Sequence, residues 1–304
     1  MKLKVAINSI EHLDYCLENN VDAIIIGNDS FSLRNSISFS LDEITEINKR
    51  KNKSEIYVLV NKIFIEDELE ALEKYLIDLS KINIKKIIFQ DFAVIHLIEK
   101  NNLNFYLNYN PETLITSYYQ FDFYKKCQIN EMSLSKELTL YEVNEITKNK
   151  TDLSIEILGH GYCFIMHSRW NLISNFEKYY NTSLDKRIWI REEMRKLSNL
   201  IYEDKDGSHM FSGYELATIN ILDKLNDLDY LKIDTFFYDS DKSILVTKIY
   251  QDAFNKIKND KYDLDFKNQA FEELDKTADK FIDNGFLKNN MKHPHLKKYE
   301  QNNK

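Results

Sequence analysis

The chain has 304 residues, of which 43% are hydrophobic and 30% charged. This composition is typical of a soluble globular protein, and it excludes a collagen-like, a membrane-embedded and a wholly disordered chain. A net charge of −8 argues against a protein whose whole surface binds nucleic acid, but it allows a local basic patch.

The first residues lack the apolar core of a signal peptide, and no run of about 18 consecutive apolar residues occurs. We therefore expect a cytoplasmic protein without membrane attachment. The three cysteines, Cys16, Cys127 and Cys163, are widely spaced and odd in number, which favours free thiols over a disulfide framework or a zinc ribbon.

Short apolar runs alternate with longer amphipathic stretches, a pattern typical of βα units around a parallel sheet. An S-x-x-E capping box, Ser40 to Glu43, predicts the start of a helix over residues 44–50. Four leucines at helical spacing predict the buried face of the next helix: Leu69, Leu72, Leu76 and Leu79. Eight strands are predicted, at residues 4–7, 23–26, 56–60, 87–89, 104–107, 131–134, 154–158 and 230–233.

Eight such units predict an α/β fold, a TIM-type (β/α) barrel whose chemistry lies at the carboxyl ends of the strands. Three polar residues past strand ends, Asn61, Asp91 and Asn108, are candidate substrate contacts, although turn chemistry explains each of them equally well.

The connection before the last strand is too long for a simple crossover. Its segments 187–191, 197–202 and 209–211, with a turn at 203–207, predict a β-hairpin insertion covering the barrel mouth. The barrel domain then spans residues 1–240, with the insertion at about 160–213. Residues 241–304 hold closing helices at 243–257 and 268–282 and a frayed tail from residue 288.

Candidate catalytic residues cluster around the seventh strand. Gly159 and Gly161 flank His160, which predicts a sharp turn that presents the imidazole to the mouth; a structural histidine is the alternative. Glu156 shares its strand parity with His160, so both are expected on one side, with Glu156 as an acid or base or as half of an ion pair. Arg169, shortly after this strand, is a candidate substrate contact.

Two further candidates are less specific. His209, beside the turn at 206–207, could bring a second imidazole to the mouth, or could be an ordinary hairpin residue. Glu137 follows a strand end and could be catalytic or could favour a helix N-terminus. Phosphate-binding loops, a serine nucleophile elbow and the two-histidine zinc motif are absent from the sequence, and His293 with His295 is a weak metal-like pair, so no metal site is predicted.

Residues 156–174 resemble the signature region of the collagenase-like peptidase family U32. Further segments follow in that family's order: residues 21–27, 31–34, 60–61, 90–91, 135–138, 191–193, 206–209 and 231–234. The length and segment 111–116 resemble the short branch without an added C-terminal domain. The resemblance implies a barrel-like domain. It also implies either a peptidase or a role like that of relatives that hydroxylate the tRNA wobble uridine, ribosomal RNA or ubiquinone precursors.

Several members of the family hold an iron–sulfur cluster through four cysteines. Here Cys163 lies near the signature, but Trp170 and Asn171 stand where a further ligand is expected, and three cysteines cannot supply four thiolates. We expect no cofactor in this chain and a cluster only in a partner. Short members resemble companions of a longer, cysteine-bearing member, which implies a hetero-oligomer that could bind tRNA. Three functions stay open: a subunit for tRNA hydroxylation, a peptidase, and a non-catalytic assembly subunit.

Overall fold

The computed structural model describes residues 1–193 and 197–288. Its centre is a closed barrel of eight parallel strands, because β11 pairs with both β7 and β1 and every other barrel strand pairs with its sequence neighbours. The predicted TIM-type barrel is confirmed. The strands are β1 (Lys2–Ala6), β2 (Ala23–Gly27), β3 (Glu55–Val60), β4 (Lys86–Phe89), β5 (Tyr106–Tyr109), β6 (Glu131–Ser133), β7 (Ser154–Ser168) and β11 (Tyr230–Ile233).

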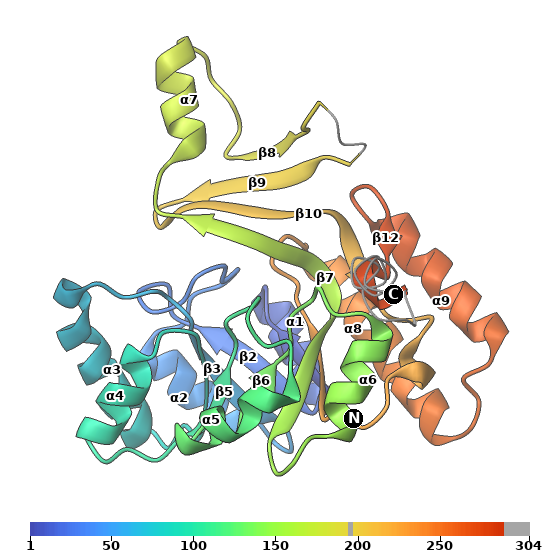
Figure 1. The fold of residues 1–304 in the computed structure, drawn as a ribbon, viewed down its shortest axis with the longest axis horizontal. Helices are drawn as coiled ribbons and strands as arrows, with labels where there is room; N and C mark the ends of the chain where they lie inside the picture. Colours follow the sequence, from blue (N-terminus) through green and yellow to red (C-terminus); the bar gives the residue numbers. More distant parts are fainter. Residues whose placement is uncertain (194–196, 289–304) are drawn as a thin grey trace, which may run out of the picture.

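Helices surround the barrel and bury their apolar faces against its outer surface (Figure 1). The predicted capping box is present: the Ser40 hydroxyl accepts from the backbone N–H of Glu43, and the Glu43 carboxylate accepts from that of Ser40. The helices are α1 (Ile10–Glu18), α2 (Leu41–Arg50), α3 (Leu69–Lys81), α4 (Ala93–Lys100), α5 (Phe121–Lys126), α6 (Leu140–Lys148), α7 (Leu172–Tyr180), α8 (Ser240–Lys258) and α9 (Leu264–Thr277). Short 3-10 turns lie at η1 (Glu66–Glu68), η2 (Tyr118–Gln120), η3 (Leu222–Lys224) and η4 (Gly285–Lys288).

Strand β7 does not end at residue 158 but continues to Ser168. Gly161 has φ +122°, and a Cβ there would lie 2.4 Å from the carbonyl oxygen of Asp234, so the glycine lets β7 pass close to the end of β11. The turn expected at Gly159 and Gly161 is thus a bend within one long strand.

Beyond the barrel, β7 begins an antiparallel extension made of β7, β10 (Gly207–Ala217), β9 (Asn199–Asp204) and β8 (Arg187–Ile190). The predicted hairpin corresponds to β9 and β10, whose turn joins Asp204 to Gly207. Helix α7 projects from the far end of this extension, away from the barrel (Figure 1).

Other predicted bounds also differ from the structure. Strand β5 lies two residues later than predicted, since its register with β4 pairs Tyr106 with Lys86. Helix α9 begins earlier because the Asp263 side chain caps it, and Ile282 belongs instead to β12 (Ile282–Asp283), which pairs with β10. The predicted tail from residue 289 onward, with His293 and His295, lies outside the described residues, and the division at residue 240 stays a prediction. Among the described helices, none combines the length and apolar character needed to cross a bilayer.

The barrel interior holds a buried charge cluster. The Lys4 ammonium lies 2.6 Å from Glu156 Oε2 and contacts the Glu131 carboxylate, and all three side chains are buried. The Tyr57 hydroxyl donates to Glu131 at 2.8 Å, and the Lys4 ammonium lies 4.0 Å from the centroid of that tyrosine ring. Burial raises the pKa of Glu131, with the neighbouring Glu156 charge acting in the same direction and Lys4 opposing it. One ammonium therefore contacts two buried carboxyl groups, and the charge of Lys232 also acts on Glu156.

We predict that Lys4→Met lowers the free energy of unfolding by about 3–5 kcal/mol, because it leaves two buried carboxyls without a cation. The pKa of both carboxyls then rises in the folded state, so the loss grows as the pH rises. Urea denaturation at acidic and alkaline pH measures this. Lys2→Met is the matched control: the Lys2 side chain is 50% exposed and lies 3.4 Å from Glu55, so its loss costs less than about 1 kcal/mol. Equal effects of the two variants would contradict the prediction.

Candidate functional site

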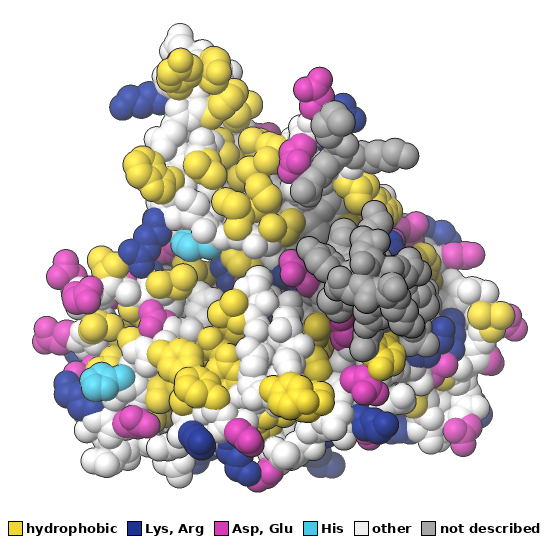
Figure 2. All heavy atoms as spheres, viewed as in Figure 1, with side chains coloured by type: hydrophobic (Ala, Val, Ile, Leu, Met, Phe, Trp, Pro, Cys, Tyr) yellow, Lys and Arg dark blue, Asp and Glu magenta, His cyan; other side chains and the backbone are white. Residues whose placement is uncertain are grey.

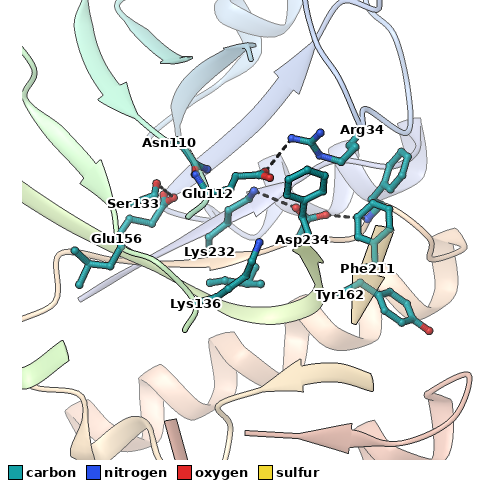
Figure 3. Close-up of a pocket in the computed structure, with 14 residues that line it drawn as sticks. Arg34, Asn110, Glu112, Ser133, Lys136, Glu156, Tyr162, Phe211, Lys232 and Asp234 are labelled. Carbon is teal, nitrogen blue, oxygen red and sulfur yellow. Dashed lines mark hydrogen bonds and ion pairs between the residues drawn. The ribbon is translucent and has the colours of Figure 1, made fainter. Parts of the chain in front are cut away.

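A cavity of about 50 Å³ lies at the carboxyl ends of the barrel strands (Figure 3). We call it the mouth cavity. Loops after β2, β5 and β6, the long strand β7, and β11 all contribute to its wall. Its charged and polar lining comprises Arg34, Asn110, Glu112, Ser133, Lys136, Glu156, Lys232 and Asp234, and its aromatic lining Tyr162, Phe164, Phe211 and Phe236.

An ion pair crosses this cavity. The Arg34 guanidinium donates to Glu112 Oε1 at 3.0 Å, although the two residues stand 78 positions apart. Both have left-handed backbone, with φ +54° for Arg34 and +66° for Glu112, a conformation that costs energy for residues with a side chain. Burial alone would raise the pKa of Glu112, but the charges of Arg34, Lys136 and Lys232 lower it below its ordinary value. The pair is thus ionised and held in a strained geometry.

The same ion pair leaves hydrogen-bonding capacity unused. Arg34 Nη1 and Glu112 Oε2 are buried and have no hydrogen-bond partner among the described residues. Buried polar atoms normally find partners, so these two atoms indicate where a ligand would bind. A group that both accepts and donates hydrogen bonds would satisfy them.

Two lysines complete the charge distribution of the mouth cavity. Burial lowers the pKa of Lys136, with Glu112 acting against it, and its ammonium lies 5.0 Å from the centroid of the Phe164 ring. The Lys232 ammonium lies 3.0 Å from Asp234 Oδ2. A buried amine with a lowered pKa gives up its proton more readily than an exposed lysine does. The cavity therefore combines a charged clamp, one candidate proton carrier and aromatic walls.

Two of the predicted residues lie at the floor of this cavity or below it. Glu156 lines the cavity but is bound from within the barrel by Lys4 and by the Ser133 hydroxyl at 2.5 Å. Asn108 is fully buried, bonds to Glu131 and accepts from Ser133 at 3.3 Å. Of the alternatives for Glu156, the structure shows the ion pair, and a catalytic role stays a prediction.

Asn61 and Asp91 hold loops in place. The Asn61 side chain accepts from the backbone N–H of Leu33 at 2.8 Å, next to Arg34, and lines a small hollow that adjoins the mouth cavity. The Asp91 carboxylate accepts from the backbone N–H groups of Phe64 and Ala93 at 2.9 Å each. These contacts are turn and loop chemistry, the alternative that the sequence left open.

His160 does not face the mouth cavity. A register shift against β11, where Lys232 pairs with Leu158 but Ile233 with His160, adds one residue to β7 and breaks the expected parity with Glu156. The imidazole is buried, with Nδ1 at 3.4 Å from the Tyr250 hydroxyl of α8, and burial together with the charge of Lys242 lowers its pKa to about 3. The expectation that it points into the mouth is corrected.

The remaining candidates lie elsewhere. His209 sits in the extension beside His167 and Asp204, and Arg169 donates to the carbonyl oxygen of Ile63 at 3.0 Å. Glu137 is exposed and lines an outer groove of about 500 Å³, whereas its neighbour Lys136 reaches the mouth cavity; α6 begins three residues after Glu137. The structure therefore does not bring the four predicted catalytic residues together.

The charged residues of the mouth cavity that the choice of candidates missed lie within segments already singled out by the resemblance. Arg34 ends segment 31–34, Glu112 lies in 111–116 and Lys136 in 135–138, while Lys232 and Asp234 lie in 231–234. The resemblance of these segments to the family was the signal in the sequence that could have found these residues. The sequence gives no indication of which side chain in each segment points into the cavity.

The described residues do not fit an iron–sulfur cluster. Cys16 lies in α1, Cys127 follows α5 and Cys163 lies in β7, and the whole sequence holds no fourth cysteine. In the part of the chain that the structure describes, no group of three or more His, Cys, Asp or Glu side chains could hold a metal ion.

We predict that Arg34→Met costs about 3 kcal/mol of unfolding free energy at neutral pH, because it strands a buried carboxylate. The pKa of Glu112 is depressed in the folded protein, so its contribution is lost as the pH falls through that pKa, and the gap between wild type and variant narrows in acid. Denaturation curves across pH measure this. Arg50→Met removes an exposed pair with Asp14 and serves as the control, costing less than about 1 kcal/mol. A gap that stays constant with pH would speak against the prediction.

Comparison with known proteins places this architecture in a family. The family model for Peptidase family U32 matches residues 8–297. The chain is 26% identical over 285 residues to "tRNA hydroxylation protein P2" of Bacillus subtilis, covering 89% of this chain and 92% of the relative. It is also 26% identical over 171 residues to "23S rRNA 5-hydroxycytidine C2501 synthase" of Escherichia coli, covering 52% of this chain but only 25% of that protein. A solved structure described as a U32 peptidase is 11% identical, with a TM-score of 0.48 over 77% of this chain and 92% of that chain.

The match of the family model extends over nearly the whole chain and includes every segment that lines the mouth cavity. This chain belongs to Peptidase family U32.

Proposed function

We propose that the protein is a subunit for hydroxylation of tRNA, with the wobble uridine as its target, and that it works with a longer member of its own family. The observation that carries this proposal is the match over 89% of the chain to a protein named for tRNA hydroxylation. Shorter matches to proteins of Haemophilus influenzae and Helicobacter pylori, each named "tRNA hydroxylation protein P", support it.

The mouth cavity suits a polar edge of a nucleobase. At about 50 Å³ it holds only one or two water-sized groups, so it is too small for a whole base. A uracil edge offers both carbonyl acceptors and an N–H donor, which match the free Arg34 Nη1 and Glu112 Oε2 atoms. Aromatic rings at the rim, such as Phe164, provide surfaces on which an unpaired base can stack.

A longer partner fits the cysteine content and the surface. This chain spans 25% and 37% of the lengths of the Escherichia coli and Haemophilus influenzae relatives, and its three cysteines do not suffice for a four-thiolate cluster. Hydrophobic side chains gather on the projecting extension and on α7, where Leu172, Phe176 and Tyr180 are exposed (Figure 2). Exposed apolar patches of this kind mark protein interaction sites. We assign this face to the longer member, and we assign the iron–sulfur cluster to that partner.

Peptidase activity is the alternative implied by the family name. The geometry gives it less support, because Glu156, His160 and His209 lie in three separate environments of the described structure, and none contacts another. Acid–base chemistry on a peptide bond needs its groups within hydrogen-bond reach of one substrate atom.

We predict that cells without the gene lose hydroxylated uridine from their tRNA, as measured by mass spectrometry of tRNA nucleosides. A gene copy encoding Lys136→Gln does not restore it, because this variant removes the candidate proton carrier of the mouth cavity. Lys126→Gln, an exposed change at the end of α5, restores it fully and is the control. Unchanged nucleosides in the strain without the gene, with gelatin or peptide cleavage by the purified chain, would favour the peptidase instead.

We predict that Phe176→Asp releases the longer family member. An acidic group in the exposed apolar face of α7 opposes burial against a partner but does not disturb the barrel core. Affinity purification of the tagged protein followed by mass spectrometry measures the amount of that partner. Phe123→Asp, at a comparably exposed phenylalanine on α5, leaves the amount unchanged; equal recovery with all three proteins rules out α7 as the contact.

A further inference from the structure

A second hollow lies where the antiparallel extension meets the barrel loops, outside the mouth cavity. We call it the rim pocket, and its volume of about 310 Å³ is in the range of small-ligand sites. Its polar lining comprises Lys62, Glu68, His167, Arg169, Lys205 and Asp206. Three of these residues are cations. His167 contacts a row of further side chains on the side away from the pocket.

The row of side chains behind His167 begins at a carboxylate. Asp204 Oδ1 lies 3.2 Å from His209 Nε2, and His209 Nδ1 lies 3.3 Å from His167 Nδ1, with the two imidazole rings stacked at 4.7 Å between centroids. His209 is completely buried, whereas His167 is half-buried at the pocket. The three groups therefore form one line from the extension to the rim pocket.

The contacts among Asp204, His209 and His167 determine which ring nitrogens carry protons. Burial would raise the pKa of Asp204, but its bond to His209 lowers it, so this group is an acceptor only. The bond to Asp204 places a proton on Nε2 of His209, and an imidazole that carries this single proton has Nδ1 as an acceptor. His167 accordingly donates through Nδ1, and its Nε2 is left without a proton.

The neutral state of His167 agrees with its surroundings. Burial lowers its pKa to about 4, and the neighbouring His209 and the Arg34 charge act in the same direction, whereas Asp204 and Asp206 oppose them. At physiological pH the imidazole is thus an uncharged ring whose Nε2 accepts one hydrogen bond.

The cations of the rim pocket are partly neutralised. Lys62 lies 2.6 Å from Glu68 and 3.3 Å from Asp206. The other two donate to backbone carbonyls and keep their net charge: Arg169 donates to Ile63, and Lys205 to Asp29 at 3.1 Å. Trp170, which follows Arg169 in the chain, is 72% exposed. Positive charge and a hydrogen-bond acceptor are two elements that single-stranded RNA sites combine.

We propose that the rim pocket binds one nucleotide of the RNA substrate next to the nucleotide at the mouth cavity. Its basic side chains face the phosphate, and His167 Nε2 accepts a hydrogen bond from an O–H or N–H group of the sugar or base. Asp204 and His209 are positioning residues that hold His167 in the accepting tautomer. This inference rests on the proposed function, because it takes the polynucleotide to be RNA.

The test uses the purified full chain and a synthetic RNA hairpin with uridine in its loop, with affinity measured by fluorescence anisotropy. His167→Phe removes the acceptor and weakens binding about tenfold, the size of one hydrogen bond. His167→Gln returns an acceptor and recovers most of the affinity. His96→Phe, the same change at an exposed histidine of α4, leaves binding unchanged. Uridine 5′-monophosphate and inorganic phosphate, added as competitors, distinguish recognition of a nucleotide from recognition of phosphate alone.

NMR of the ¹⁵N-labelled histidines reads the tautomers directly. The expected spectrum shows His209 protonated on Nε2 and His167 on Nδ1, and the Nε2 signal of His167 shifts when the hairpin binds. Asp204→Ala abolishes the single tautomer of His209 and weakens binding, whereas a residue that only supports folding would change neither signal.

The inference is overturned if the wild-type chain does not bind the hairpin, or if correctly folded His167→Phe binds as tightly as wild type. The experiments distinguish failure of this inference from failure of the proposed function. Loss of binding in His167→Phe, combined with unchanged tRNA nucleosides in cells without the gene, keeps the rim pocket and discards hydroxylation. Loss of hydroxylated uridine in cells without the gene, combined with normal binding by His167→Phe, keeps hydroxylation and discards the rim pocket.

Discussion

The barrel depends on the ion pairs that the Lys4 ammonium makes with Glu131 and Glu156. This ammonium lies in the barrel interior between Glu131 of β6 and Glu156 of β7, and so connects the first strand to two strands with which it does not pair. Buried ion pairs add little net stability over apolar packing, but an unpaired member is strongly unfavourable. Any arrangement of strands that fails to bring these three side chains together is therefore disfavoured, which makes the cluster a device for selecting one barrel register.

The sequence predicted the fold well because the fold follows from local patterns. Apolar runs marked the eight barrel strands, and capping residues such as Ser40 and Glu43 marked a helix start. The long course of β7 was not predictable in this way, since the glycines that let it bend also resemble the end of a strand. Their meaning depends on Asp234, a residue more than seventy positions away along the chain.

The site was harder to predict than the fold for the same reason. The Arg34–Glu112 pair joins two loops through left-handed backbone, a conformation that residues other than glycine rarely adopt and that no spacing rule indicates. His160 was misplaced by one extra residue in β7, which reverses the side on which a side chain lies. Of the three polar residues expected past strand ends, Asn108 lies within β5, and Asn61 and Asp91 bond to loop backbone. Whether such a residue binds a ligand or a loop depends on distant partners.

Strand β7 is continuous from the barrel wall to the base of α7, so the two proposed sites share one piece of backbone. Its first part carries Glu156 at the floor of the mouth cavity, and its last part carries His167 at the rim pocket. A protein bound at α7 that tilts the extension also changes the angle of this strand relative to β11. If the proposed RNA binding in the mouth depends on that angle, thermodynamic reciprocity requires that RNA changes the affinity for the protein by the same factor. Assembly and substrate loading would then be coupled through a single β-strand.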